Sequence, residues 1–449
     1  MGLNSGAGKS RQPVRRGALA ALTGGYETSS FTERVERAGE PVCTRSELLI
    51  GVLFVALLTF IFFGSILRGA TLSNIPSTQQ LSAPWATTSK PLFVYPQQDQ
   101  ADLYYPHLVL ETRAWRSGTF PFWDPLNLGG VPLLSNGQSG VAYPVRIVLA
   151  LLASPGTNHD LVVLIHVFLS GLFMFLLLKE YRVRLLPALL GAPAWMFASW
   201  TTGLMNDEVT LIATTWLAAA LLLIHQASRT RSWRRAAAAG VPLALMALGG
   251  QLQYVAIAFG VCGAYALVLA LSPSDLRHVR QRWDLRRLVY PVLTLGVCAG
   301  LAAVTLWPTA LNLSEGGRVA PSYVDFVSNH TLALDTFRHV VSRGPINGYT
   351  LFFDGMYMGI VPICLAFVGF IVRRPGAALG RWLAVGTFLV AVGTPVVTWL
   401  AYHVIPGVSR LSSTGQGLWL FDFGVVLLAA IGLAALLDAS LRVTRGLRS

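Results

Sequence analysis

Ten long apolar segments constrain the fold of this chain more than any other feature of its sequence. A spanning α-helix needs about 20 mostly apolar residues, because every backbone amide in lipid must find its partner within its own segment. The sequence therefore predicts an all-α integral membrane protein with about ten transmembrane helices. The segments run Leu48 to Leu67, Leu161 to Leu178, Leu185 to Gly203, Val209 to Gln226, Ala236 to Gly250, Tyr254 to Leu271, Leu288 to Leu311, Met356 to Val372, Trp382 to Ala401 and Leu418 to Leu437.

The composition agrees with this class. Of the 449 residues, 53% are hydrophobic and only 12% are charged, whereas soluble domains carry about 25% charged residues. The net charge of +13 would favour a nucleic-acid partner in a soluble chain. In a membrane protein it follows from the enrichment of Lys and Arg in cytoplasmic loops. We therefore expect membrane lipids and no nucleic acid as partners.

The distribution of basic residues predicts the orientation. If the N-terminus is cytoplasmic, the inside segments hold 25 of the 34 Lys and Arg residues, as the positive-inside rule requires. We expect a multi-pass plasma-membrane protein with both termini cytoplasmic. A basic, disordered tail (1–47) would precede the membrane domain (48–437), and a second basic tail (438–449) would follow it. Two long loops, 68–160 and 312–355, would then lie outside.

The first of these loops contains two apolar stretches that are too short to span a bilayer. In "DLYYPHLVLETRAWRSG", Leu103, Leu108, Leu110 and Trp115 recur at helical spacing, which predicts an interfacial helix. "YPVRIVLALLASPG" predicts a second interfacial or re-entrant helix. Between them, the almost uncharged segment 118–144 is rich in Pro, Gly and Asn, and its turns fold it back on itself. We expect this segment to be a lid over a cavity at the lipid edge, although a purely structural loop remains the alternative.

Asp99 and Asp102 stand at the start of the first interfacial helix and are the candidate catalytic residues. A carboxylate near a helix N-terminus stays ionised and can accept a proton from an alcohol. Either residue can instead cap the helix. We favour a functional role for Asp99 and capping for Asp102, and we expect His166, in the second span, to be a hydrogen-bonded packing residue.

A series of motifs resembles the YfhO-type bacterial membrane proteins in its order along the chain. They are "DQADLYYP", "RSGTFPFWDPLNLGGVPLLSNGQSGVAYP", "HVFLSGLFMFLL", "GGQLQYVAIAFGVCGAYAL", "LWPTALNLSEGGR", "YMGIVP" and "IPGVSR". The resemblance extends from about Asp99 to the C-terminus. It implies a GT-C-type glycosyltransferase, which takes a sugar from a polyprenyl-phosphate carrier at the outer face of the membrane.

The resemblance also assigns roles. Asp99 falls where the family has its general base, and Arg410 matches an Arg in the loop before the last span. The family usually has Asn at the position of Asp124 and His near Asp207 and at Gln251, so this chain departs from the pattern there. A second Arg that the family usually has shortly after Arg410 is replaced within "LSSTG". Family members also commonly continue into further spans and an external C-terminal domain, which are missing from this sequence.

Sugar transfer from a lipid phosphate needs a base, a cation for the departing phosphate and a pocket that excludes water. Arg343 is a further candidate for the phosphate, and Arg410 could instead pair with Asp422. The loop carboxylates Asp99, Asp102 and Asp124 leave room for a divalent cation such as Mg²⁺. The candidate substrate-binding residues are Trp123, Asp124, Asn136, Gln138, Tyr143, Asp207, Glu208, Gln251, Gln253, Arg318 and Arg410.

The sequence thus predicts a membrane glycosyltransferase with a polyprenyl-phosphate-linked sugar donor and an acceptor in the cell envelope, with Asp99 as general base. The acceptor would be a glycan, a lipid or a protein. Two alternatives stay open. One is a transporter or flippase for a lipid-linked sugar, and the other is a non-catalytic subunit with the same fold.

Overall fold

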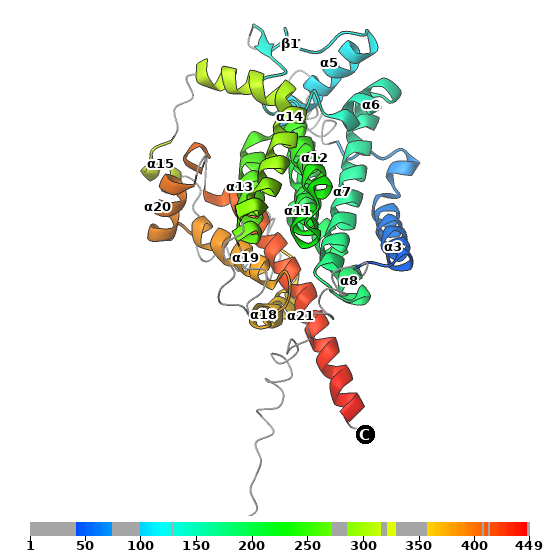
Figure 1. The fold of residues 1–449 in the computed structure, drawn as a ribbon. Helices are drawn as coiled ribbons and strands as arrows, with labels where there is room; N and C mark the ends of the chain where they lie inside the picture. Colours follow the sequence, from blue (N-terminus) through cyan, green and yellow to red (C-terminus); the bar gives the residue numbers. More distant parts are fainter. Residues whose placement is uncertain are drawn as a thin grey trace, which may run out of the picture.

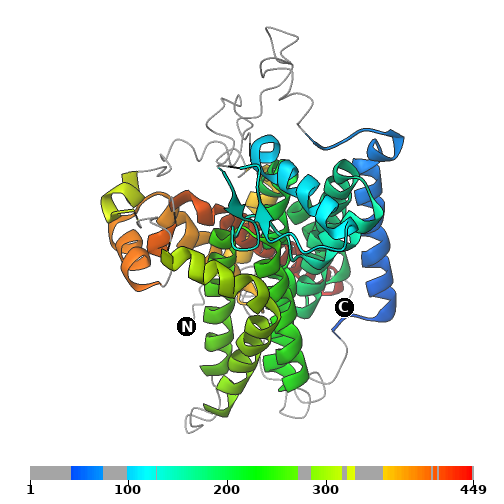
Figure 2. The same cartoon turned by 90° about the horizontal axis from the view of Figure 1, so that it is seen from above.

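The computed structural model describes residues 42–73, 99–127, 129–271, 285–315, 321–328, 357–405, 408–411 and 414–446. Most of them lie in helices, and the longer helices form a bundle (Figure 1). Shorter elements from the first long loop lie across one end of the bundle, which we call the capped end (Figure 2). The helical fold class predicted from the sequence is confirmed at this level.

Each helix or strand named below belongs either to the cap or to the bundle. The cap consists of the π-helix η2 (Gln100–Tyr104), α5 (Tyr105–Arg116), the strands β1 (Trp123–Asp124) and β2 (Val131–Pro132), and α6 (Pro144–Leu152). The bundle helices are α3 (Arg45–Phe63), α7 (Pro155–Glu180), α8 (Leu185–Met196), α9 (Ser199–Gly203), α10 (Glu208–Thr215), α11 (Leu217–Thr230), α12 (Trp233–Gly249), α13 (Leu252–Leu271), α14 (Val289–Glu315), α15 (Tyr323–Ser328), α18 (Ile360–Ile371), α19 (Ala377–Ala391), α20 (Pro395–Val404) and α21 (Leu418–Gly446).

Within the described ranges, six helices are long and apolar enough to cross a membrane. They include α3, α7, α13 and the continuous pair α10 and α11; the other two contain α14 and α21. The bent pair α19 and α20 would make a seventh span. The larger count of ten stays a prediction, because α12 and α18 are shorter than these six.

Two of the expected spans are wrong as single straight helices. The segment expected from Leu185 to Gly203 divides at Phe197 into α8 and α9. The segment expected from Trp382 to Ala401 bends by 100° between α19 and α20. At this bend Gly393 has a φ of +67° and Pro395 begins the next helix. Pro has no amide hydrogen to continue the preceding helix. The break therefore depends on these two residues, and a prediction from hydropathy alone missed it because the segment is apolar throughout.

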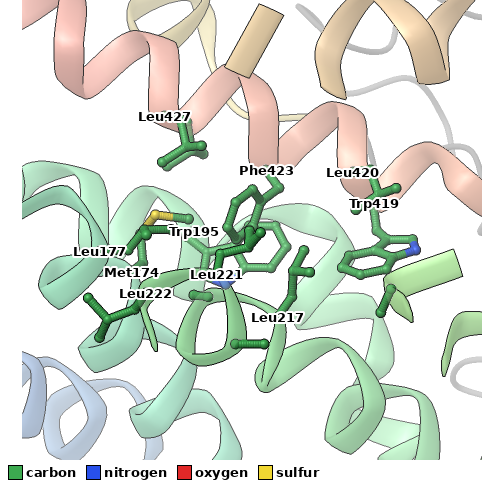
Figure 3. Packing of buried hydrophobic residues seen from close by; sticks show 14 of the residues in the cluster. Met174, Leu177, Trp195, Leu217, Leu221, Leu222, Trp419, Leu420, Phe423 and Leu427 are labelled. Carbon is green, nitrogen blue, oxygen red and sulfur yellow. The ribbon is translucent and has the colours of Figure 1, made fainter. Parts of the chain in front are cut away.

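Small residues let the last helices of the chain approach closely. A Cβ atom added at Gly369 of α18 would overlap the backbone oxygen of Leu428 in α21. A Cβ atom added at Gly432 of α21 would likewise overlap the backbone oxygen of Leu365 in α18. In lipid, such van der Waals packing replaces the hydrophobic drive that joins helices in water. Figure 3 shows the adjoining core, where the rings of Trp195 and Phe423 meet edge-on with centroids 5.1 Å apart.

Ion pairs join the helices at the end opposite the cap. Lys179 lies 2.7 Å from Glu47, and the guanidinium of Arg374 lies 2.8 Å from Asp438. Since these residues come from the end of α7, the start of α3, the loop after α18 and the later part of α21, the segments assigned to the cytoplasm meet at one end of the bundle. The visible C-terminal end of α21 also lies there (Figure 1).

The cap shows how the described part of the first long loop is arranged, whereas the interfacial position of its helices stays a prediction. Helices occur where the short apolar stretches predicted them, as α5 and α6. The intervening segment folds back, with Trp123 opposite Pro132 in an antiparallel pair of strands. The expected apolar face of the first helix, however, is not its most buried face. The residues that it buries in the protein include His107 and Glu111, because the cap contains charged partners that the sequence pattern did not reveal.

Candidate functional site

A stripe of polar side chains on η2 and α5 faces the interior of the capped end. Gln100, Tyr104, His107 and Glu111 are each about 1% exposed. Their spacing of four, three and four residues places them on one side of a helix. Sequence reasoning missed this stripe because it followed the apolar positions of the same helix, although the spacing itself was visible.

The far end of this stripe holds a buried ion pair. The Glu111 carboxylate lies 3.0 Å from the Arg146 guanidinium of α6, and both side chains are 2% exposed. Arg146 also donates to the backbone oxygen of Ser139 at 2.6 Å. Asn158 of α7 donates to the backbone oxygen of Arg146 at 3.2 Å. The pair therefore fastens α5, α6, α7 and the loop before α6 to one another.

Next along the stripe, His107 faces the β-hairpin. Its Nε2 atom lies 3.6 Å from the carboxylate of Asp124. Burial lowers the pKa of His107, although the charge of Asp124 acts in the opposite direction. Asp124 also accepts a hydrogen bond from the backbone amide of Leu126 at 2.9 Å. Asp124, which was expected to bind substrate or metal, thus lies at the end of β1, beside a histidine.

Two adjacent carboxylates begin α10 beneath the cap. Asp207 caps the helix, accepting from the amide of Thr210 at 3.1 Å and from its hydroxyl at 2.7 Å. Burial raises the pKa of Asp207 to about 7, and the nearby charges of Glu208 and Asp99 act in the same direction. Glu208 lies 3.3 Å from Nδ1 of His159 in α7. The other nitrogen of His159 lies 2.8 Å from the Gln100 amide nitrogen.

The hairpin between α12 and α13 contributes Gln251. This residue has a φ of +54°, a conformation that costs a non-glycine residue free energy and is common at functional sites. Its amide oxygen accepts from Gln138 of the loop at 3.3 Å, and its amide nitrogen donates to the hydroxyl of Tyr104 at 3.4 Å. Gln138, Gln251 and Tyr104 therefore connect the loop to η2.

Glycines bring the loop backbone against this hairpin. Gly140 has a φ of +67°, and a Cβ atom there would lie 2.8 Å from both the Gly249 oxygen and an Arg146 nitrogen. The amide of Leu252 donates to the oxygen of Gly137 at 3.3 Å. The loop is thus docked onto the bundle through its backbone at positions where a larger residue would not fit.

Asp99 and Asp102, at the start of η2, are both exposed. Asp99 directly precedes η2 and makes no side-chain cap to it. Its charge nevertheless acts on two buried groups, since it contributes to raising the pKa of Tyr104 and of Asp207. Asp99 therefore lies at the edge of the cluster, in electrostatic reach of the α10 carboxylates.

The remaining candidates of the loop and the hairpin have separate surroundings. The indole of Trp123 is 53% exposed and covers Gly130. Asn136 is partly buried, and its backbone amide donates to Leu133. Gln253 accepts a hydrogen bond from Gln416 at 2.5 Å.

Tyr143 has no exposed surface, which leaves no ring face for a sugar. Its hydroxyl lies 2.6 Å from His166 and accepts from Trp216 at 3.1 Å. His166 also lies 2.6 Å from the Val162 oxygen, so the packing role expected for this histidine is confirmed.

The candidate phosphate ligands lie elsewhere or outside the described residues. Arg410 is exposed in a short 3₁₀ turn (Val408–Arg410). Asp422 is fully buried in α21, and within the described residues neither of its carboxylate oxygens has a hydrogen-bond partner. The alternative pairing of Arg410 with Asp422 is therefore absent from the described part of the chain. Arg318 and Arg343 lie outside the described residues.

A divalent cation does not fit the loop carboxylates as they are arranged. The carboxylate of Asp124 lies beside His107 and accepts from the backbone amide of Leu126, whereas Asp99 and Asp102 lie at the start of η2. Across the residues that the structure describes, no group of three His, Cys, Asp or Glu residues is arranged to hold a metal ion.

Comparison with known proteins shows similarity at the level of the fold. No family model matches the sequence, and no curated protein does. A mutant form of the arabinofuranosyltransferase AftD from Mycobacteria is similar in structure, with a TM-score of 0.52 and 15% identity over 88% of this chain and 25% of that chain. A second AftD structure has a TM-score of 0.48 at 15% identity, over 87% of this chain and 24% of that one, and we base nothing on it. The chain therefore shares its fold with part of this arabinofuranosyltransferase and spans about a quarter of that enzyme's length.

Proposed function

We propose that this protein is a membrane glycosyltransferase that takes its sugar from a polyprenyl-phosphate donor at the outer face of the plasma membrane. The acceptor would be a glycan, lipid or protein of the cell envelope. The observation that carries the proposal is the buried acidic cluster at the capped end. There, Asp207 and Glu208 lie beneath the first long loop, within electrostatic reach of Asp99. The fold shared with an arabinofuranosyltransferase supports the same class of reaction.

In this proposal Asp99 is the general base. It deprotonates the acceptor hydroxyl, whose oxygen attacks the anomeric carbon while the lipid phosphate departs from the opposite face, which inverts the configuration. Asp99 is suited to this role because it is exposed, whereas Asp207 and Glu208 are buried. A base must reach the substrate to accept its proton.

Arg410, Arg318 and Arg343 remain the candidates for the donor phosphate, since a guanidinium grips phosphate oxygens through paired hydrogen bonds. We also propose that the chain is related to the YfhO-type membrane proteins, whose order of motifs its sequence resembles.

The proposal is tested with Asp99→Asn in the purified full-length chain, reconstituted in proteoliposomes. A suitable first donor is a radiolabelled polyprenyl-phosphate arabinofuranose, because the similar structure is named an arabinofuranosyltransferase. Polyprenyl-phosphate mannose and glucose serve as parallel donors. We expect sugar transfer by the wild type and a loss in kcat of roughly 10²-fold or more in the variant. The matched control is Glu315→Gln, which removes an exposed carboxylate at the end of another helix.

The two alternatives give different results in the same preparation. A transporter for the lipid-linked sugar would keep most of its flux in Asp99→Asn, and the fully buried Asp422 inside a span is the kind of residue that ion-coupled transport uses. A non-catalytic subunit would transfer no sugar alone with any donor, while the proteoliposomes still contained folded protein. Either result would refute the glycosyltransferase proposal.

A further inference from the structure

The π-helix η2 is an unusual element at a critical place. It begins directly after Asp99, and the amide of Tyr105 donates to the oxygen of Gln100, five residues earlier. Helical turns of this width are rare and often occur at functional sites. Such a turn needs anchors from outside itself, because its own hydrogen bonds favour it less than they favour an α-helix.

Both ends of η2 are anchored by side chains of other elements. Tyr104, the last residue, accepts from Gln251 of the α12–α13 hairpin. Gln100, the first residue and the neighbour of Asp99, lies 2.8 Å from Nε2 of His159. His159 belongs to α7 and is 1% exposed, so the bundle holds the turn where the proposed base is attached.

The contacts of His159 determine its tautomer. Its Nδ1 atom lies 3.3 Å from the Glu208 carboxylate, so Nδ1 must carry the hydrogen, because a lone pair facing a carboxylate would be repelled. Nε2 is then an acceptor in the neutral ring. It therefore takes a hydrogen bond from the amide nitrogen of Gln100, which faces it. A series of close contacts therefore runs from Gln100 through His159 to the carboxylate of Glu208.

We propose that His159, oriented by Glu208, is a positioning residue that fixes the η2 turn and with it the proposed base Asp99. His159 touches neither Asp99 nor the substrate in this scheme. Glu208 holds the imidazole of His159 in a given orientation. His159 in turn holds Gln100, and through it the turn that carries Asp99. The catalytic consequence rests on the proposed function, whereas the anchoring of the η2 turn by His159 does not.

The placement is tested by hydrogen exchange on the full-length protein in nanodiscs, without any substrate. In His159→Leu we expect the peptide covering residues 99–105 to exchange roughly fivefold faster, because one buried hydrogen bond of about 1 kcal/mol is lost. His159→Gln, whose amide oxygen can still accept from Gln100, should restore most of the protection. The control is His225→Leu, which removes a histidine bonded to Tyr265 at 2.7 Å near the opposite end of the bundle and should leave this peptide unchanged. Unchanged exchange in His159→Leu would overturn the inference, whatever the activity.

The catalytic consequence is tested by a double-mutant comparison in the transfer assay. We expect His159→Leu to lower kcat roughly tenfold with little change in KM, since a misplaced base slows the chemistry and not the binding. In the Asp99→Asn background, His159→Leu should cause no further loss, because a residue that acts only through Asp99 has nothing left to position. An additive loss would refute the inference and leave the glycosyltransferase proposal standing. Full activity in Asp99→Asn, together with faster exchange in His159→Leu, would refute the role of Asp99 and leave the positioning of the turn intact.

Discussion

Asp207→Asn should stabilise this protein at alkaline pH and leave it nearly unchanged in acid. Asp207 is buried at the start of α10, and burial raises its pKa from 3.8 to about 7. The folded state therefore prefers the protonated carboxyl. The stability that this preference gives is fully present below pH 4 and is lost as the pH rises through 7. Asn has nearly the same shape as the protonated acid, caps helices equally well and never ionises.

The magnitude follows from the size of the shift. About three pKa units at 1.36 kcal/mol each amount to about 4 kcal/mol between low and high pH. We expect the apparent Tm of Asp207→Asn to exceed that of the wild type by roughly 5 °C at pH 8.5 and to match it at pH 4.5. The measurement is thermal unfolding in detergent, followed at a fixed scan rate because membrane proteins unfold irreversibly.

The control for this prediction is Asp325→Asn, which alters an exposed carboxylate in the first turn of the short helix α15 that accepts from the amide and the hydroxyl of Ser322. It should show no gain at pH 8.5. If Asp207→Asn and the wild type differ by the same amount at every pH, then Asp207 ionises in the folded protein as it does in water, and the account of the buried cluster fails.

Two further predictions concern the docking of the loop. Gly140→Ala should cost about 2 kcal/mol or more, because it adds a Cβ against Gly249 to an unfavourable φ, and proteolysis within 118–143 should become faster. Gly118→Ala has a similar φ and open space, so an equal effect of both would contradict close docking. Arg146→Met should cost about 3–5 kcal/mol in chemical unfolding, because it leaves Glu111 buried without its partner. Adding Glu111→Met should recover most of that loss, and a further loss would contradict the pairing.

The sequence predicted the long helices well because their cause is local. A run of apolar residues such as that in α7 or α21 identifies itself without reference to the rest of the chain. The bend between α19 and α20 was less accessible, since Gly393 and Pro395 interrupt a segment that is apolar throughout. The helices of the cap were predicted from the spacing of apolar residues, but the direction in which α5 faces was not.

The candidate site shows the same division. Asp207, Glu208 and Gln251, at the ends of apolar segments, and Gln138, in the loop, were all predicted as substrate-binding candidates, and they meet in one cluster. Their partners on η2, α5 and α6 were not identified. A polar residue in a short amphipathic helix is ordinarily solvated, so nothing in the local pattern distinguished Glu111 from a surface residue.

The sequence by itself determined that this chain is a helical membrane protein and that segment 118–144 turns back on itself, because hydropathy and turn residues act over a few neighbouring positions. Only the tertiary structure decided which charged groups face one another, as Glu111 faces Arg146 and His159 faces Glu208. The physical reason is that a buried charge is tolerated only beside a partner. That partner comes from a distant part of the chain, which only the packing of the helices brings near.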